Sequence, residues 1–246
     1  MDEVLGIVLA AGQGTRMKTD LPKVLCRAAE RPLLDYVLDA LTAAGVTQQV
    51  IVVGYRGDLV RAAVAERPRT ECVEQTERLG TGHAVRCCLP QIARHRGPVV
   101  IVAGDSPMIQ SSSIRELLAE FRRRQAAVLL GTLHKPDPTG LGRIVRDARG
   151  QFTGIVEEKD ATPAQRAITE VNMSTYVFDA ESLVQALGQL TNNNRQGEYY
   201  LTDCPGILLA AGREVAALPV LKPCESLSVN TPEELALVEA ELRRME

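Results

Sequence analysis

The chain has 246 residues, of which 45% are hydrophobic and 24% charged, and its formal net charge at pH 7 is −3. This composition is typical of a globular protein, and it excludes a wholly disordered or fibrous chain. A slightly acidic chain without Trp is also a poor candidate for a nucleic-acid-binding protein. Because no apolar stretch could span a membrane and the first residues are acidic, we expect a cytoplasmic protein.

The first half of the chain alternates short β-branched runs with helical patterns. Strands buried on both faces are predicted at residues 4–11, 49–53, 71–74 and 98–103. Helices are predicted around 33–41, at 57–66 and at 82–93. A further helix follows Ser113, which is predicted to cap it in a Ser-x-x-Glu box with Glu116. This alternation indicates an α/β fold with a mostly parallel sheet.

The second half is less regular. Strands are predicted at residues 127–133, 143–146, 151–157 and 170–178, and helices at 180–190 and 202–211. A last helix is predicted after Thr231, with Pro232 at its first position and Glu234 closing a capping box. No repeat or linker interrupts the chain, so we expect one compact unit.

A glycine-rich loop follows the first predicted strand. It reads Leu-Ala-Ala-Gly-Gln-Gly-Thr-Arg-Met over residues 9–17, and Leu-Pro-Lys-Val follows at 21–24. Small residues at the carboxyl end of a strand let a ligand approach the backbone, and glycines leave amides free to face phosphate or a base edge. Residues 12–31 contain five basic and two acidic side chains, a local charge of +3. These features indicate an anion-binding site.

Two common glycine-loop motifs fit poorly. The loop has Met17 where a dinucleotide-binding fingerprint needs its third glycine, and no acidic residue ends a second strand at the required distance. A phosphate-binding Walker loop needs Gly-Lys-Ser/Thr, which is absent.

The loop and the motifs that follow it resemble the sugar-1-phosphate nucleotidyltransferase family. The motifs occur in the family's order and comprise Gln75, Leu-Gly-Thr-Gly-His-Ala at 79–84, Gly104-Asp105, Asp-Pro-Thr-Gly-Leu-Gly-Arg at 137–143, Ile-Val-Glu-Glu-Lys-Asp-Ala at 155–161, Glu-Val-Asn at 170–172, and the run 190–203. Within the family, the set is most similar to the uridylyltransferase domain of the bacterial N-acetylglucosamine-1-phosphate uridylyltransferases. The match runs from Val4 to about Asn230.

The resemblance implies a Rossmann-like, GT-A-like α/β fold in which a mostly parallel mixed sheet is flanked by helices. It implies a single nucleotidyltransferase domain over residues 1–246. Residues 1–125 would mainly bind the nucleotide, 126–230 would mainly bind the sugar, and 231–246 would form a C-terminal helix.

The implied reaction transfers a uridylyl group from UTP to N-acetylglucosamine 1-phosphate, giving UDP-N-acetylglucosamine and pyrophosphate. Arg16 and Lys23 match the family's phosphate-contacting cations, and Asp105 and Asn230 match its Mg²⁺ ligands. The substrate-binding positions that match are Leu9, Ala10, Ala11, Gly12, Gly14, Gln75, Gly80 and Thr81 for the nucleotide, and Gly140, Glu157 and Asn172 for the sugar.

The chain departs from the family pattern at two positions: Ala103 stands where Tyr is frequent, and Ser174 where Gly is expected. The family's bifunctional members continue into an acetyltransferase domain, whereas this sequence stops after one helix. We therefore expect a single activity, small-molecule partners without nucleic acid or membrane, and a monomer or dimer. Three alternatives stay open: another sugar 1-phosphate or dTTP as substrate, a non-catalytic nucleotide-sugar-binding module, and a dinucleotide oxidoreductase.

Overall fold

The structure, a computed structural model, describes residues 3–245. Within these residues nine strands form one sheet: β1 (Leu5–Ala10), β4 (Gln48–Val53), β5 (Thr70–Glu74), β6 (Pro98–Ala103), β7 (Val128–His134), β8 (Gly142–Arg146), β9 (Phe152–Val156), β10 (Glu170–Asp179) and β11 (Val215–Leu218). The main path runs β11-β7-β10-β6-β1-β4-β5, and β8 and β9 extend from β10. On this path only β10 runs antiparallel to its neighbours, so the predicted mostly parallel sheet is confirmed.

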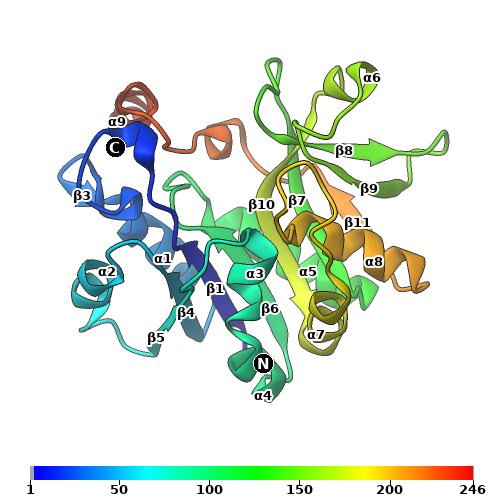
Figure 1. Ribbon diagram of the computed structural model, residues 1–246, viewed down its shortest axis with the longest axis horizontal. Helices are drawn as coiled ribbons and strands as arrows, with labels where there is room; N and C mark the ends of the chain where they lie inside the picture. The colour runs from blue at the N-terminus through cyan, green and yellow to red at the C-terminus, as the bar shows by residue number, and fades with distance from the viewer. Residues whose placement is uncertain (1–2, 246) are drawn as a thin grey trace.

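Helices cover both faces of the sheet (Figure 1). One face carries α1 (Leu33–Ala43), α2 (Gly57–Val64) and α5 (Ser111–Arg124), whose apolar side chains share a core with the sheet. The other face carries α3 (Thr81–Arg86), α4 (Leu89–Arg94), α7 (Ala180–Gln189) and α8 (Cys204–Ala210). Two further helices, α6 (Pro163–Arg166) and α9 (Pro232–Met245), lie outside these layers. In residues 3–245 no helix is long and apolar enough to cross a membrane.

The central strands form because their residues are apolar on both faces, as a sheet covered by helices on both sides requires. Every residue of β6 except the last is buried, as are five of the six residues of β1. The expectation for residues 71–74 was wrong in this respect. Strand β5 is the sheet's edge, and its residues are partly or fully exposed.

The helix predicted over residues 82–93 is two helices. Helix α3 ends at Arg86 and α4 begins at Leu89, with Pro90 in its first turn. A proline has no N–H, and its ring would clash with the carbonyl four residues earlier, here that of Arg86. The chain therefore ends one helix and starts another, where Pro90 is tolerated.

The predicted cap of α5 was also wrong. The helix begins at Ser111, and Ser113 is a buried residue of its first turn. The carboxylate of Glu225 accepts hydrogen bonds from the Gln110 N–H at 3.0 Å and from the Ser113 hydroxyl at 2.6 Å. Glu225, which is distant in sequence, thus accepts the hydrogen bonds at the start of this helix, and Glu116 does not form the predicted capping box.

The remaining differences concern short elements. The small hairpin of β2 (Arg27–Ala28) and β3 (Arg31–Pro32), and β11, have too few residues to show a periodic pattern. By contrast, the capping box of α9 is confirmed: the Glu234 N–H donates to the Thr231 hydroxyl at 3.3 Å, and the Thr231 N–H donates to the Glu234 carboxylate at 3.1 Å.

Candidate active site

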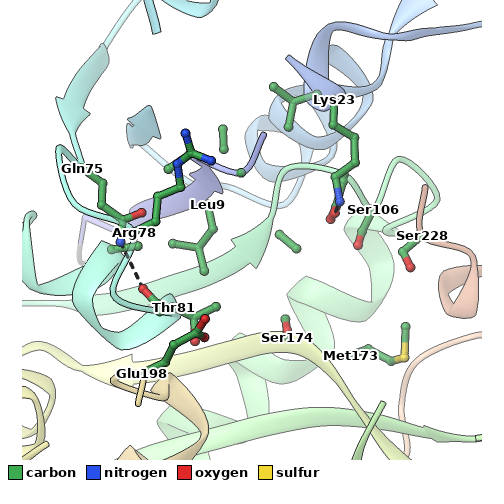
Figure 2. A pocket seen from close by; sticks show the side chains of 18 of the residues that line it. Leu9, Lys23, Gln75, Arg78, Thr81, Ser106, Met173, Ser174, Glu198 and Ser228 are labelled. Atoms are coloured by element: carbon green, nitrogen blue, oxygen red, sulfur yellow. Dashed lines mark hydrogen bonds and ion pairs between the residues drawn. The ribbon is translucent and has the colours of Figure 1, made fainter. Parts of the chain in front are cut away.

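A cavity of about 420 Å³ opens at the sheet edge where the carboxyl ends of β1 and β6 face the first half of β10 (Figure 2). Ligands of open α/β sheets bind at this edge, because the loops that follow parallel strands converge there. Ten of the residues predicted for the site line the cavity: Leu9, Ala10, Ala11, Gly12, Lys23, Gln75, Gly80, Thr81, Asp105 and Asn172. The other five, Gly14, Arg16, Gly140, Glu157 and Asn230, are not among its lining residues.

Lys23 joins the two predicted metal ligands. Its Nζ forms an ion pair with the Asp105 carboxylate and donates a hydrogen bond to Asn230 Oδ1 at 2.8 Å. Asp105 follows β6, whereas Asn230 immediately precedes the Thr231 cap of α9. The backbone also links them, since the Val229 N–H donates to the Asp105 carbonyl at 3.0 Å. Folding therefore brings three predicted residues from distant parts of the chain to one point.

The two oxygens of Asp105 and Asn230 contact the same ammonium group, so they lie close enough together to hold a single cation. A carboxylate and an amide oxygen are hard donors, which suit a small divalent cation that keeps most of its shell for phosphates and water. Within residues 3–245, no group of three His, Cys, Asp or Glu side chains is placed to form an all-protein metal site. The donor set therefore fits a cation that is shared with a phosphorylated ligand.

The two glycines of the loop have different roles. A Cβ at Gly12 would meet nothing within 4 Å, so its backbone faces open space beside the cavity. Gly14 has φ +65°, and a Cβ there would lie 2.6 Å from the Lys23 Cβ. Gly14 is thus needed to let Lys23 pack against the loop. Arg16 lies in a short 3-10 helix (Thr15–Met17) and is exposed.

Gln75 and Gly80 form the opposite wall. The Gln75 Nε2 donates to the Gly80 carbonyl at 3.1 Å (Figure 2). The same nitrogen lies 3.1 Å from His83 Nδ1. Because the Gly80 carbonyl can only accept, the Gln75 amide nitrogen must face it, and its oxygen is left for another donor. Gly80 has φ +102°, and a Cβ would lie 2.6 Å from the Tyr199 carbonyl oxygen. Thr81 accepts a hydrogen bond from the Leu201 N–H at 3.1 Å, which ties this wall to the segment before α8.

Asn172 and Ser174 lie on β10, where the pairing with β7 is interrupted by a bulge between Asn172 and Thr175. Asn172 Nδ2 donates to the Tyr176 hydroxyl at 2.7 Å, and its Oδ1 accepts from the Ser174 N–H at 3.3 Å. Ser174 has φ +52°, a left-handed conformation that glycine adopts without strain. The bulge thus explains why the family pattern has glycine where this chain has Ser174. It also places the Ser174 side chain at the cavity.

Glu157 and Gly140, the other two residues predicted to bind the sugar, are not among the residues that line the cavity. Glu157 accepts a hydrogen bond from the Thr202 hydroxyl at 2.9 Å, and burial raises the pKa of its carboxyl above the usual value. Gly140, with φ +81°, lies in the exposed loop before β8, where its N–H is 3.4 Å from a Glu158 carboxylate oxygen.

Several residues that line the cavity were not predicted as site residues from the sequence. Arg78 and Glu198 bring charge to the cavity, and Ser106 and Ser228 bring hydroxyl groups. Arg78 lies three residues after Gln75, within the stretch that carried the resemblance, and its charge was a usable signal. Ser228 had none, because tertiary contacts of its segment, such as the bond from the Val229 N–H to the Asp105 carbonyl, bring it to the cavity.

The family model of the MobA-like NTP transferase domain matches residues 6–196. A bifunctional protein GlmU from Pelotomaculum thermopropionicum is 42% identical over 242 residues, which is 98% of this chain and 52% of that protein. A protein of the same name from Lactococcus lactis subsp. lactis is 43% identical over 236 residues, or 96% of this chain and 51% of that protein. The chain spans about half the length of these relatives.

A solved structure of a UDP-glucose pyrophosphorylase complexed with UDP-glucose matches with a TM-score of 0.81. It is 17% identical in sequence, and the match covers 100% of both chains. This likeness confirms the predicted α/β fold.

Proposed function

Because the chain belongs to the family of MobA-like NTP transferase domains, we propose that it transfers a uridylyl group from UTP to N-acetylglucosamine 1-phosphate and releases pyrophosphate. The observation that carries this proposal is the meeting of Lys23, Asp105 and Asn230 at the edge of the cavity that Gln75 lines on its other side. The similarity to two relatives named GlmU, at 42% and 43% identity over nearly the whole of this chain, supports the choice of reaction.

In the proposed reaction, a phosphate oxygen of the sugar phosphate attacks the α-phosphorus of UTP, and pyrophosphate leaves. Such a step needs no covalent nucleophile, because alignment and charge neutralisation supply most of the catalysis. Lys23 would turn its ammonium from Asp105 toward the α-phosphate, where charge develops. Arg16, which is exposed beside the loop, would contact the departing pyrophosphate.

The uracil ring would lie against Gln75 and Gly80. The Gln75 oxygen that remains after the contact with Gly80 is an acceptor, which matches the N3–H of uracil. Cytosine has an unprotonated nitrogen at that position, so it would place two acceptors face to face. This difference favours UTP over CTP.

The sugar would lie on the side of β10. Asn172, held in one orientation by Tyr176 and Ser174, would present its amide to the sugar. Glu157 and Gly140 do not line the cavity, so the loops that carry them would need to move for these residues to contact the sugar. On this proposal, residues 1–125 mainly bind the nucleotide and 126–230 mainly the sugar within one domain.

Asp105 and Asn230 fit Mg²⁺, since each supplies one hard oxygen to the same point. Bound there together with the phosphates, the ion would neutralise part of their negative charge. Releasing Lys23 from both oxygens would leave its ammonium free to contact the nucleotide.

A grid of nucleoside triphosphates against sugar 1-phosphates tests the proposal, with pyrophosphate release as the readout. UTP with N-acetylglucosamine 1-phosphate should give the highest kcat/KM. A preference for dTTP or for glucose 1-phosphate would contradict the proposed substrates but keep the reaction. Nucleotide binding without any pyrophosphate release would instead indicate a binding module.

A further inference from the structure

Arg78 lies in the loop between β5 and α3 and is one of the residues that line the cavity (Figure 2). Its Nη1 donates a hydrogen bond to the Gln13 side-chain oxygen at 2.8 Å, and Gln13 belongs to the glycine-rich loop after β1. Its guanidinium carbon lies 6.0 Å from the centre of the ring of Tyr55, a residue in the loop after β4. Arg78 therefore connects the loops that follow three neighbouring strands.

Among the described residues 3–245, Arg78 is the basic residue of the cavity lining that forms no ion pair. Among the residues 3–245, four charged side chains line the cavity: Lys23, Arg78, Asp105 and Glu198. Lys23 and Asp105 form an ion pair. Within the described chain, Arg78 has no carboxylate within ion-pair distance, and its partners are a neutral amide and an aromatic ring. A guanidinium in this position is available to an anion.

We propose that Arg78 binds the β- and γ-phosphates of the nucleoside triphosphate, whose oxygens would replace the Gln13 side chain. This inference rests on the proposed function. Gln13 lies between Gly12 and Gly14, so phosphates that approach the amides of this loop come within reach of Arg78. A guanidinium forms paired hydrogen bonds with phosphate oxygens, and these charge-assisted bonds are stronger than a bond to a neutral amide.

Calorimetric titration of the chain with UTP and with UMP in Mg²⁺ buffer tests this role. Arg78→Ala should weaken UTP binding about tenfold, which is the scale of one charge-assisted hydrogen bond. UMP carries the same base but a single phosphate, so its affinity should change by much less. Arg78→Lys should recover part of the UTP affinity, because it keeps the charge without the paired donors.

Arg94→Ala is the matched control. Arg94 is exposed on α4 and does not line the cavity, so the variant loses the same charge without losing a contact to the ligand. Its UTP affinity should equal that of the parent chain. Circular dichroism verifies the fold of each variant, and Arg78→Gln carries the same test if Arg78→Ala does not fold.

Two results would overturn the inference. One is UTP binding by Arg78→Ala within twofold of the parent. The other is an equal loss of UTP and UMP affinity, which would place Arg78 against the uridine or the α-phosphate that both nucleotides carry. The slope of UTP affinity against salt concentration gives a second readout, and it should be shallower in Arg78→Ala. A parent chain that binds no nucleotide would instead contradict the proposed function itself.

Discussion

Lys23 holds two oxygens that come from opposite ends of the chain, the Asp105 carboxylate and Asn230 Oδ1. In the free protein its charge is compensated by Asp105, so it does not leave an unpaired ammonium beside the cavity. On the proposed function, a cation that takes the two oxygens would make the same ammonium available to a phosphate. Lys23 would then neutralise Asp105 in the free protein and contact the substrate once the cation is bound.

Replacing Lys23 tests its role at the α-phosphate. Lys23→Ala should lower kcat by about 10²–10³, the range seen when one preorganised electrostatic group is removed. The measurement is steady-state pyrophosphate release, with Lys135→Ala, outside the cavity lining, as the charge control. A kcat within threefold of the parent would show that Lys23 only neutralises Asp105.

Gln75 is expected to decide the choice of base. Because Nε2 donates to the Gly80 carbonyl, the Gln75 oxygen would be the group that distinguishes uracil from cytosine. An unsatisfied polar pair costs about 1–3 kcal/mol, so Gln75→Ala should reduce the ratio of kcat/KM for UTP over CTP by about tenfold or more. The exposed Gln185 on α7 offers a control, Gln185→Ala, in which the ratio should not change. An unchanged ratio in Gln75→Ala would assign base selection to the backbone.

At the scale of elements, the start of α5 depends on the segment before α9. The Glu225 carboxylate, 4% exposed, accepts from the Gln110 and Lys222 N–H groups and from the Ser113 hydroxyl. It therefore satisfies groups at the start of α5 that lack partners within the helix. One carboxylate therefore connects a helix of the first half of the chain to a short 3-10 helix, Pro223–Ser226, of the last quarter.

Glu225→Ala should lower the free energy of unfolding by about 1–3 kcal/mol, because it leaves buried donors without an acceptor. Chemical denaturation measures this loss. The matched variant is Glu116→Ala, which removes the exposed carboxylate of the predicted capping box and should change stability by less than about 0.5 kcal/mol. Equal effects of the two variants would show that local capping matters as much as the distant contact.

At the scale of the whole molecule, α9 couples the C-terminal part of the chain to the cavity. Val238 of α9 is fully buried and packs in a cluster with Met17, Ala28 and Met108, near the glycine-rich loop and the end of β6. Glu234 of the same helix accepts a hydrogen bond from the Asn230 N–H at 2.6 Å. The position of one proposed metal ligand therefore depends on how α9 docks.

Loosening α9 should consequently change the metal requirement. Val238→Ala should lower the free energy of unfolding by about 1–3 kcal/mol, as expected for deleting buried methyl groups. It should also raise the Mg²⁺ concentration needed for half-maximal pyrophosphate release, and EDTA should abolish turnover. Leu237→Ala, at a position 59% exposed on the same helix, should change neither quantity. Loss of stability with an unchanged Mg²⁺ requirement would show that Asn230 is positioned without α9.

The strands and helices with strong periodicity could be predicted from the sequence, because the spacing of their apolar residues indicates which faces are buried. The glycine-rich loop and the motif at 79–84 could be proposed as a site because they resemble motifs of a known family. The structure gives a physical reason for two of these glycines, since Gly14 and Gly80 have positive φ angles and close backbone or side-chain neighbours. Contacts between distant segments could not be predicted, since no local pattern encodes them. The cap that Glu225 provides for α5, the meeting of Lys23 with Asn230, and the bridge from Arg78 to Gln13 exist only because the folded sheet brings their segments to the same edge.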